Sequence, residues 1–188
     1  MYRALAYLAL NSETDLDNER ALARLADSHP IRVKLEGPEG AYRIYAGAME
    51  LGAELASSAV TAVVSTVAAH PLVRERMVRE QRAIAAEGPV VMAGRDIGTV
   101  VLPEAQHKIF LTASLSARVK RRGAEMQAAG VDVSAHRLLE EIVERDRLDE
   151  TRATSPLRAA PDATLIDSTG LTAEEVADRI VAIARAGS

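Results

Sequence analysis

The stretch Pro89-Val90-Val91-Met92-Ala93-Gly94-Arg95-Asp96-Ile97-Gly98 indicates the fold class of this chain. Its first five residues are apolar without interruption, which is typical of a strand buried on both faces of a parallel sheet. The glycine-flanked turn that follows carries Arg95 and Asp96. Ligands of open parallel sheets bind beyond the carboxyl ends of the strands, so this turn is a candidate ligand site. An ordinary charged turn between strand and helix has the same composition, and the turn alone is weak evidence.

Strands and helices are expected to alternate along the rest of the chain. Residues 108–112 and 164–167 are two further apolar runs of strand length, and residues 31–35 and 41–46 predict a peripheral hairpin around a turn at 37–40. Helical spacing predicts helices that begin near Tyr2 and cover 18–26, 55–69, 72–86, 116–129, 135–150 and 172–185. The order predicts an α/β fold with a parallel sheet flanked by helices, in one domain over 1–188.

Composition excludes several classes of function. The 188 residues include no cysteine, so disulfides, thiolate metal sites and a cysteine nucleophile are excluded. The longest nearly uncharged apolar stretch, 59–69, is well short of the roughly 20 residues that a membrane span needs, and no signal peptide is recognisable. The net charge of −4 argues against a nucleic-acid partner. We expect a cytoplasmic monomer that binds small molecules.

The helix expected at 135–150 carries charges where its apolar stripe should continue. Leu138 and Ile142 are followed, on the same spacing, by Arg145, Asp149 and Arg152. Burial of unpaired charge costs several kcal/mol, so this end of the helix is predicted to line a wet cleft that holds a polar or charged ligand. The alternative is a pair between Arg145 and Asp149 on a solvated face, worth a few tenths of a kcal/mol.

Two other helices are rich in arginine. Arg118, Arg121 and Arg122 follow the strand expected at 108–112; such a run is usually a solvated helix face, but it is also suited to clamp a polyphosphate. The helix at 72–86 carries Arg74, Arg76, Arg79 and Arg82, and most of these four are expected to be surface ion-pair residues. Ser65 lies within an apolar helical run, where a serine usually bonds back to its own helix.

Several motifs together resemble those of bacterial cytidylate kinases. They are residues 94–103 (GRDIGTVVLP), 108–111 (KIFL), 144–146 (ERD) with Asp149 and Arg152, 166–169 (IDST), 1–5 (MYRAL), Ser65 with 67–69, and Pro71 with 73–75. These motifs are jointly specific, and they extend over essentially the whole chain. The resemblance favours the cleft interpretation of the charged helix.

The resemblance implies a P-loop nucleoside monophosphate kinase fold, with a nucleotide-binding insertion at 27–70 and a lid at 115–133. It implies transfer of the γ-phosphoryl group of ATP, with Mg²⁺, to CMP or dCMP. The family pattern places Ser65, Arg74 and Asp96 around the cytosine, and it places Arg3, Arg95 and Arg152 on the acceptor phosphate. It places Arg145 and Asp149 at the sugar. Arg118, Arg121 and Arg122 correspond to the lid.

The sequence departs from the family pattern in two features, one loop and one residue. The family has a Gly-rich loop ending in Lys-Ser/Thr, whereas Lys34, Lys108 and Lys120 follow valine, histidine and valine. We therefore expect the sequence to lack the N-terminal P-loop segment and its strands, and the chain as written to be poorly stable and inactive with ATP. An inactive CMP-binding protein is the alternative. Ala56 stands where the family usually has arginine, which puts one contact near the acceptor phosphate in doubt.

Overall fold

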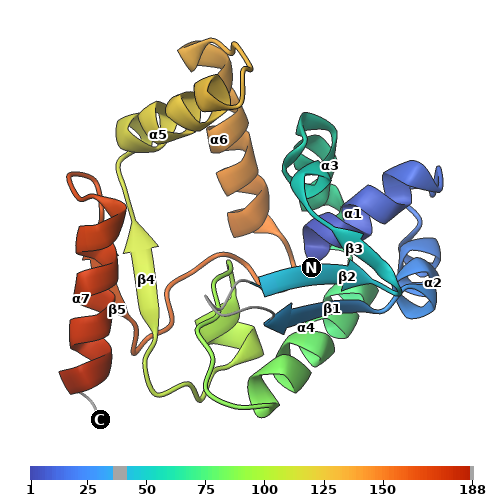
Figure 1. Ribbon diagram of the computed structural model, residues 1–188, viewed down its shortest axis with the longest axis horizontal. Coiled ribbons are helices and arrows are strands. Elements are labelled where there is room, and N and C mark those ends of the chain that lie inside the picture. The colour runs from blue at the N-terminus through green and yellow to red at the C-terminus, as the bar shows by residue number, and fades with distance from the viewer. Residues whose placement is uncertain (36–41, 187–188) are drawn as a thin grey trace. The chain divides into compact units, whose positions relative to one another are not determined.

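The computed structural model describes residues 1–35 and 42–186, and Figure 1 shows its helices and strands. The chain forms two compact units. Unit 1 comprises Met1–Met92 and Arg152–Thr154, and unit 2 comprises Ala93–Thr151 and the chain from Ser155 onward. The turn expected at 37–40 lies outside the described residues. The boundaries of the insertion and of the lid stay predictions.

The helices of unit 1 lie close to the ranges expected from the sequence, except that the helix expected at 55–69 begins at Ser58. They are α1 (Tyr2–Asn11), α2 (Glu19–Ser28), α3 (Ser58–Ala69) and α4 (Pro71–Ala86), with the short 3-10 helix η1 (Ala53–Ala56) before α3. The side chain of Asn18 caps α2 by accepting from the amide of Ala21 at 3.0 Å. Pro71 occupies the start of α4, where its missing amide hydrogen costs no helical bond.

An antiparallel sheet packs on these helices. Its described strands β1 (Ile31–Leu35), β2 (Tyr42–Ala46) and β3 (Met49–Leu51) pair in that order. The sequence predicted β1 and β2 but not β3, because three residues are too few for alternation to be visible. The core lies between one face of the sheet and the helices, with these side chains in one buried cluster: Leu5, Leu22, Ile31, Ala46, Leu51, Val67, Val73 and Met77.

Unit 2 contains the parallel pairing that the sequence predicted. Strands β4 (Ile109–Thr112) and β5 (Thr164–Asp167) pair in parallel, with Ile109 opposite Thr164. Its helices are α5 (Leu115–Ala128), α6 (Ala135–Thr151) and α7 (Ala173–Ala186). The predicted capping box of α7 is confirmed: Thr172 and Glu175 exchange hydrogen bonds of 2.7 and 3.2 Å. No helix in the described residues combines the length and apolar character needed to cross a membrane.

The buried strand predicted at residues 89–93 is wrong. These residues form no strand, and the side chains of Val90 and Val91 are 42% and 94% exposed. A strand forms where a neighbouring strand satisfies its backbone amides and carbonyls, and none of the described strands pairs with this stretch. An apolar run alone therefore did not decide the local structure. The parallel sheet of the described residues has two strands in place of the three expected.

Candidate functional site

The turn at residues 94–98 positions Asp96 in unit 2. A single turn of π-helix (Ile97–Val101) follows Asp96, whose carbonyl accepts from the amides of Val100 and Val101 at 2.9 and 3.2 Å. A Cβ at Gly94 would lie 2.9 Å from the side chain of Ile97, so this tight winding requires glycine. Asp96 itself is only 4% exposed. Asp96 is therefore a buried carboxylate directly after a glycine turn, and its role toward a ligand stays a prediction.

The charged stripe of α6 turns toward the interior, as the cleft interpretation predicted. Leu138 and Asp149 are the buried residues of this helix, while Ile142 and Arg145 are half-buried. Asp149 is 4% exposed, and its Oδ2 lies 3.2 Å from Nε of Arg95. The alternative of a solvated face is therefore wrong for Asp149. The structure brings Arg95 and Asp149 together although they are far apart in sequence.

Asp146, the last residue of the motif at 144–146, was not among the site residues expected from the sequence. It accepts two hydrogen bonds from the guanidinium of Arg118, of which Nη2 to Oδ1 is 2.9 Å. The bond from Arg118 holds the pKa of Asp146 below its ordinary value, and the charges of Arg95 and Arg145 act in the same direction. The available signal was its position three residues before Asp149, on the same side of α6.

The other two arginines of α5 also have partners within unit 2. Arg121 donates to the hydroxyl of Ser168 at 3.1 Å, to the carbonyl of Ser168, and to the carbonyl of Leu171 at 3.0 Å. Arg122 pairs with Glu125 one turn along its helix at 3.0 Å. The contacts of Arg121 hold α5 to the segment after β5, whereas the pair of Arg122 lies within α5. Their proposed role toward phosphate stays a prediction.

Arg74 in unit 1 is buried, so it is not one of the surface ion-pair arginines expected on most of α4. It is 2% exposed, its Nη1 donates to the carbonyl of Ala68 at 2.9 Å, and its guanidinium lies 5.2 Å from the ring centroid of Tyr2. The carbonyls in the last turn of a helix lack helical partners and carry partial negative charge, so the end of α3 attracts a cation. Arg76 does pair with Asp27 at the surface, as predicted for most of α4.

The remaining candidates of unit 1 lie on or near α1 and α3. Nη1 of Arg3 donates to the carbonyl of Leu55 at 2.8 Å and to the hydroxyl of Thr61 at 3.0 Å, which ties α1 to η1 and α3. Ser65 is half-buried on α3, one turn before Ala68. Arg152 is half-buried in the short segment that belongs to unit 1. Ala56, at the end of η1, is exposed.

The described residues contain no cluster of side chains suited to bind a metal ion. No three His, Asp or Glu side chains among residues 1–35 and 42–186 lie close enough to hold an ion. In nucleotide-dependent kinases Mg²⁺ keeps several waters and is bound largely through substrate phosphates.

Comparison with known proteins agrees with the resemblance in the sequence. The family model described as cytidylate kinase matches residues 1–186. The cytidylate kinase of Pelotomaculum thermopropionicum is 47% identical over 187 residues, which are 100% of this chain and 82% of that protein. The cytidylate kinase of Geobacillus thermodenitrificans is 50% identical over 183 residues, 97% of this chain and 81% of the relative. That of Streptococcus pneumoniae is 43% identical over 182 residues, with 97% and 81% covered. The chain therefore belongs to the cytidylate kinase family.

Proposed function

We propose that this protein transfers the γ-phosphoryl group of ATP to CMP or dCMP, giving ADP and CDP or dCDP, as a cytoplasmic monomer. Membership of the cytidylate kinase family supports the reaction class. The observation that carries the choice of acceptor is the burial of Asp96 in its glycine turn. A buried carboxylate can accept a hydrogen bond from the 4-amino group of cytosine.

Base recognition follows from the hydrogen-bonding capacity of two side chains. As the family resemblance implies, Asp96 accepts from the 4-amino group, Arg74 donates to the ring N3 or O2, and the Ser65 hydroxyl is a further polar contact. Uracil presents a carbonyl oxygen where cytosine presents the amine. Two acceptors would then face each other without a proton, and a site built for a donor rejects such an analogue strongly.

The other candidates serve the anionic and hydroxyl groups of the acceptor. Arg95 in unit 2 and Arg3 and Arg152 in unit 1 neutralise the 5′-phosphate, for which planar guanidinium groups are well suited. Arg145 and Asp149 hydrogen-bond the sugar. The ion pair between Arg95 and Asp149 supports this assignment, because it fixes a phosphate-binding group beside a hydroxyl-binding group.

Phosphoryl transfer requires positioning and charge stabilisation more than proton transfer. An oxygen of the CMP phosphate attacks the γ-phosphorus as the bond to the bridging oxygen of ADP breaks. Arg118, Arg121 and Arg122 stabilise the charge on the transferring group, and magnesium bound with ATP neutralises part of the donor's charge. To contact the transferring phosphoryl group, Arg118 breaks its ion pair with Asp146. This ion pair is therefore replaced by a phosphate contact when the lid closes.

The competing proposal, a CMP-binding protein without kinase activity, receives no support from relatives that are cytidylate kinases. The activity of a polypeptide of these 188 residues alone is a different question. Because it contains no Gly-rich loop ending in Lys-Ser/Thr, we expect it to bind CMP and not to use ATP.

Calorimetric titration of this polypeptide with CMP and UMP tests base recognition without requiring turnover. Asp96→Asn should narrow the preference for CMP over UMP by about tenfold or more, because an amide can donate to the uracil carbonyl. Asp132→Asn, an exposed carboxylate in the same unit, is the matched control and should leave the ratio unchanged. Equal ratios in the wild type and Asp96→Asn would show that Asp96 does not recognise the base.

A further inference from the structure

The sheet of unit 1 has an outer face that none of the proposed substrate contacts uses. Ile31, Ala46 and Leu51 lie in the buried cluster with residues of α1 and α4. The register places Arg32 opposite Tyr45, and Tyr45 opposite Glu50, so these side chains share the other face. Arg3 and Arg74 belong to helices on the core side. The outer face is therefore separate from them within unit 1.

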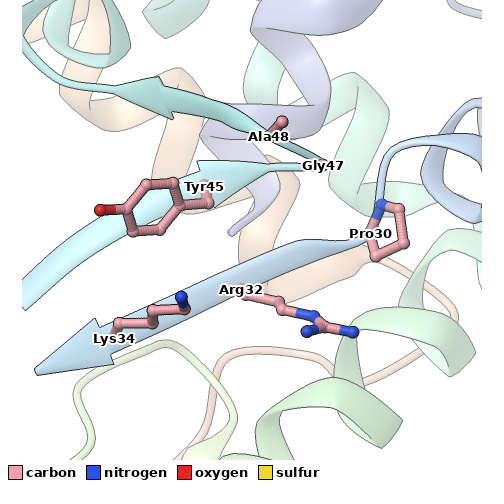
Figure 2. Close-up of a pocket in the computed structure, with 6 residues that line it drawn as sticks. All are labelled: Pro30, Arg32, Lys34, Tyr45, Gly47 and Ala48. Carbon is pink, nitrogen blue, oxygen red and sulfur yellow. The ribbon is translucent and has the colours of Figure 1, made fainter.

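This outer face contains a hollow, which we call the hairpin hollow. Its volume is about 420 Å³, and its lining residues are Pro30, Arg32, Lys34, Tyr45, Gly47 and Ala48. Figure 2 shows Lys34 on β1 turned toward the ring of Tyr45 on β2, with the guanidinium of Arg32 extending toward Pro30. The Lys34 Nζ lies 5.2 Å from the ring centroid. Small-molecule sites commonly have volumes of about 300–1,000 Å³, and the hairpin hollow is within that range.

No carboxylate of the described residues neutralises the two cations of the hairpin hollow. Glu50, the acidic residue on this face, is paired with Arg43 at 2.5 Å. Arg32 and Lys34 are exposed, and neither forms an ion pair with a carboxylate of the described residues. Two cations therefore flank one half-buried aromatic ring in a chain whose net charge is −4. An anion with an aromatic part complements this arrangement.

We propose that the hairpin hollow is a second, non-catalytic site for a nucleoside polyphosphate. Arg32 and Lys34 bind the phosphates, and the base stacks on the face of Tyr45 that Lys34 leaves as it turns to the phosphate. The bounded volume and the acidic net charge favour a free nucleotide over a nucleic-acid strand, which needs an extended basic track. The proposal does not depend on the kinase reaction.

NMR titration of the 188-residue protein tests the site directly. CTP, added after saturation with CMP, should shift the amide resonances of residues 31–34 and 45–48 in a saturable way. Arg32→Glu/Lys34→Glu should weaken this binding by about tenfold or more, since two charge-assisted contacts are lost. Arg20→Glu/Arg24→Glu makes the same change of charge on the exposed surface of α2 and should have less than a twofold effect. Tyr45→Ala should weaken CTP binding while leaving inorganic tripolyphosphate binding unchanged.

Four outcomes would overturn the proposal. The first is the absence of shifts at residues 31–34 and 45–48. The second is equal weakening by both double variants, because that shows a general effect of charge. The third is binding of tripolyphosphate as tight as that of CTP, since the ring then contributes nothing. The fourth is tighter binding of a uridine oligonucleotide than of UTP at the same residues, which would identify a nucleic-acid surface.

Discussion

Nε of Arg95 lies 3.2 Å from Oδ2 of Asp149, although 54 positions separate the two residues in the chain. Asp149 is buried and Arg95 is half-buried. This pair links the glycine turn to the charged end of α6. Two of the residues proposed to bind the acceptor are therefore held against each other within unit 2.

Removal of the Asp149 carboxylate should weaken CMP binding. Asp149→Ala loses the proposed sugar contact and releases the Arg95 side chain, and we expect the Kd for CMP to rise by about tenfold or more, measured by calorimetry. Asp162→Ala, which removes a largely exposed carboxylate paired with Lys108 in the same unit, serves as the control. A Kd for CMP that rises equally in both variants would contradict the assignment of Asp149.

The ion pair between Arg118 and Asp146 should make stability depend on pH in the acid range. The pKa of Asp146 is lowered in the folded protein, so the unfolded chain binds more protons as pH falls. The stabilisation is fully present above the unfolded pKa of about 4 and is lost as pH decreases through the folded value. Its size should be about 1 kcal/mol or less for a pair with partial exposure.

Urea unfolding between pH 7 and pH 3 measures this dependence. Asp146→Asn should reduce the loss of unfolding free energy over that range, whereas Asp132→Asn, at an exposed position, should leave the wild-type profile unchanged. If Asp146→Asn shows the same acid dependence as the wild type, the pair with Arg118 contributes nothing to it.

Two arginines of α4 should differ sharply in their effect on stability. Arg74→Ala removes a buried side chain that satisfies the Ala68 carbonyl and covers the Tyr2 ring, at a cost of about 2–4 kcal/mol. Arg76→Ala removes a surface pair with Asp27 and should cost about 1 kcal/mol or less. Chemical denaturation of the two variants gives the comparison, and similar losses would place Arg74 outside the core.

Val91 should be insensitive to substitution despite its apolar surroundings in sequence. Because its side chain is 94% exposed, Val91→Ser should change the unfolding free energy of the 188-residue polypeptide by about 0.5 kcal/mol or less. Val73→Ser, at a fully buried position of α4, should cost about 2 kcal/mol or more. A large loss of unfolding free energy for Val91→Ser in the same thermal or denaturant melts would instead support the buried strand that the sequence predicted.

The features that could be predicted from sequence are those set by neighbouring residues. The proline at the start of α4 and the capping box of Thr172 and Glu175 each act within one helical turn, and the structure has both. The cap at Asn18 acts over the same short range, although only the helix was predicted there. The charged stripe through Arg145 and Asp149 was also visible, because helical periodicity places these residues on the side of Leu138.

The features that could not be predicted depend on partners distant in sequence. Residues 89–93 have the composition of a buried strand, but strand formation depends on a neighbour that the local sequence does not reveal. The pairing of Asp146 with Arg118 spans 28 positions, and nothing near Asp146 indicates it. Arg74 is followed in sequence by Glu75 and Arg76, and its burial involves the end of α3 and the ring of Tyr2.

The central claim is that the acceptor is a cytosine nucleoside monophosphate. The most direct test uses the protein isolated from its source cells, after its intact mass has been recorded. This protein is incubated with Mg-ATP and, in separate reactions, with CMP, dCMP, UMP, AMP or GMP. Chromatography of the products should show CDP and dCDP, with UMP converted at least about a hundredfold more slowly at equal concentration. Conversion of UMP or a purine nucleotide at the same rate as CMP would contradict the account.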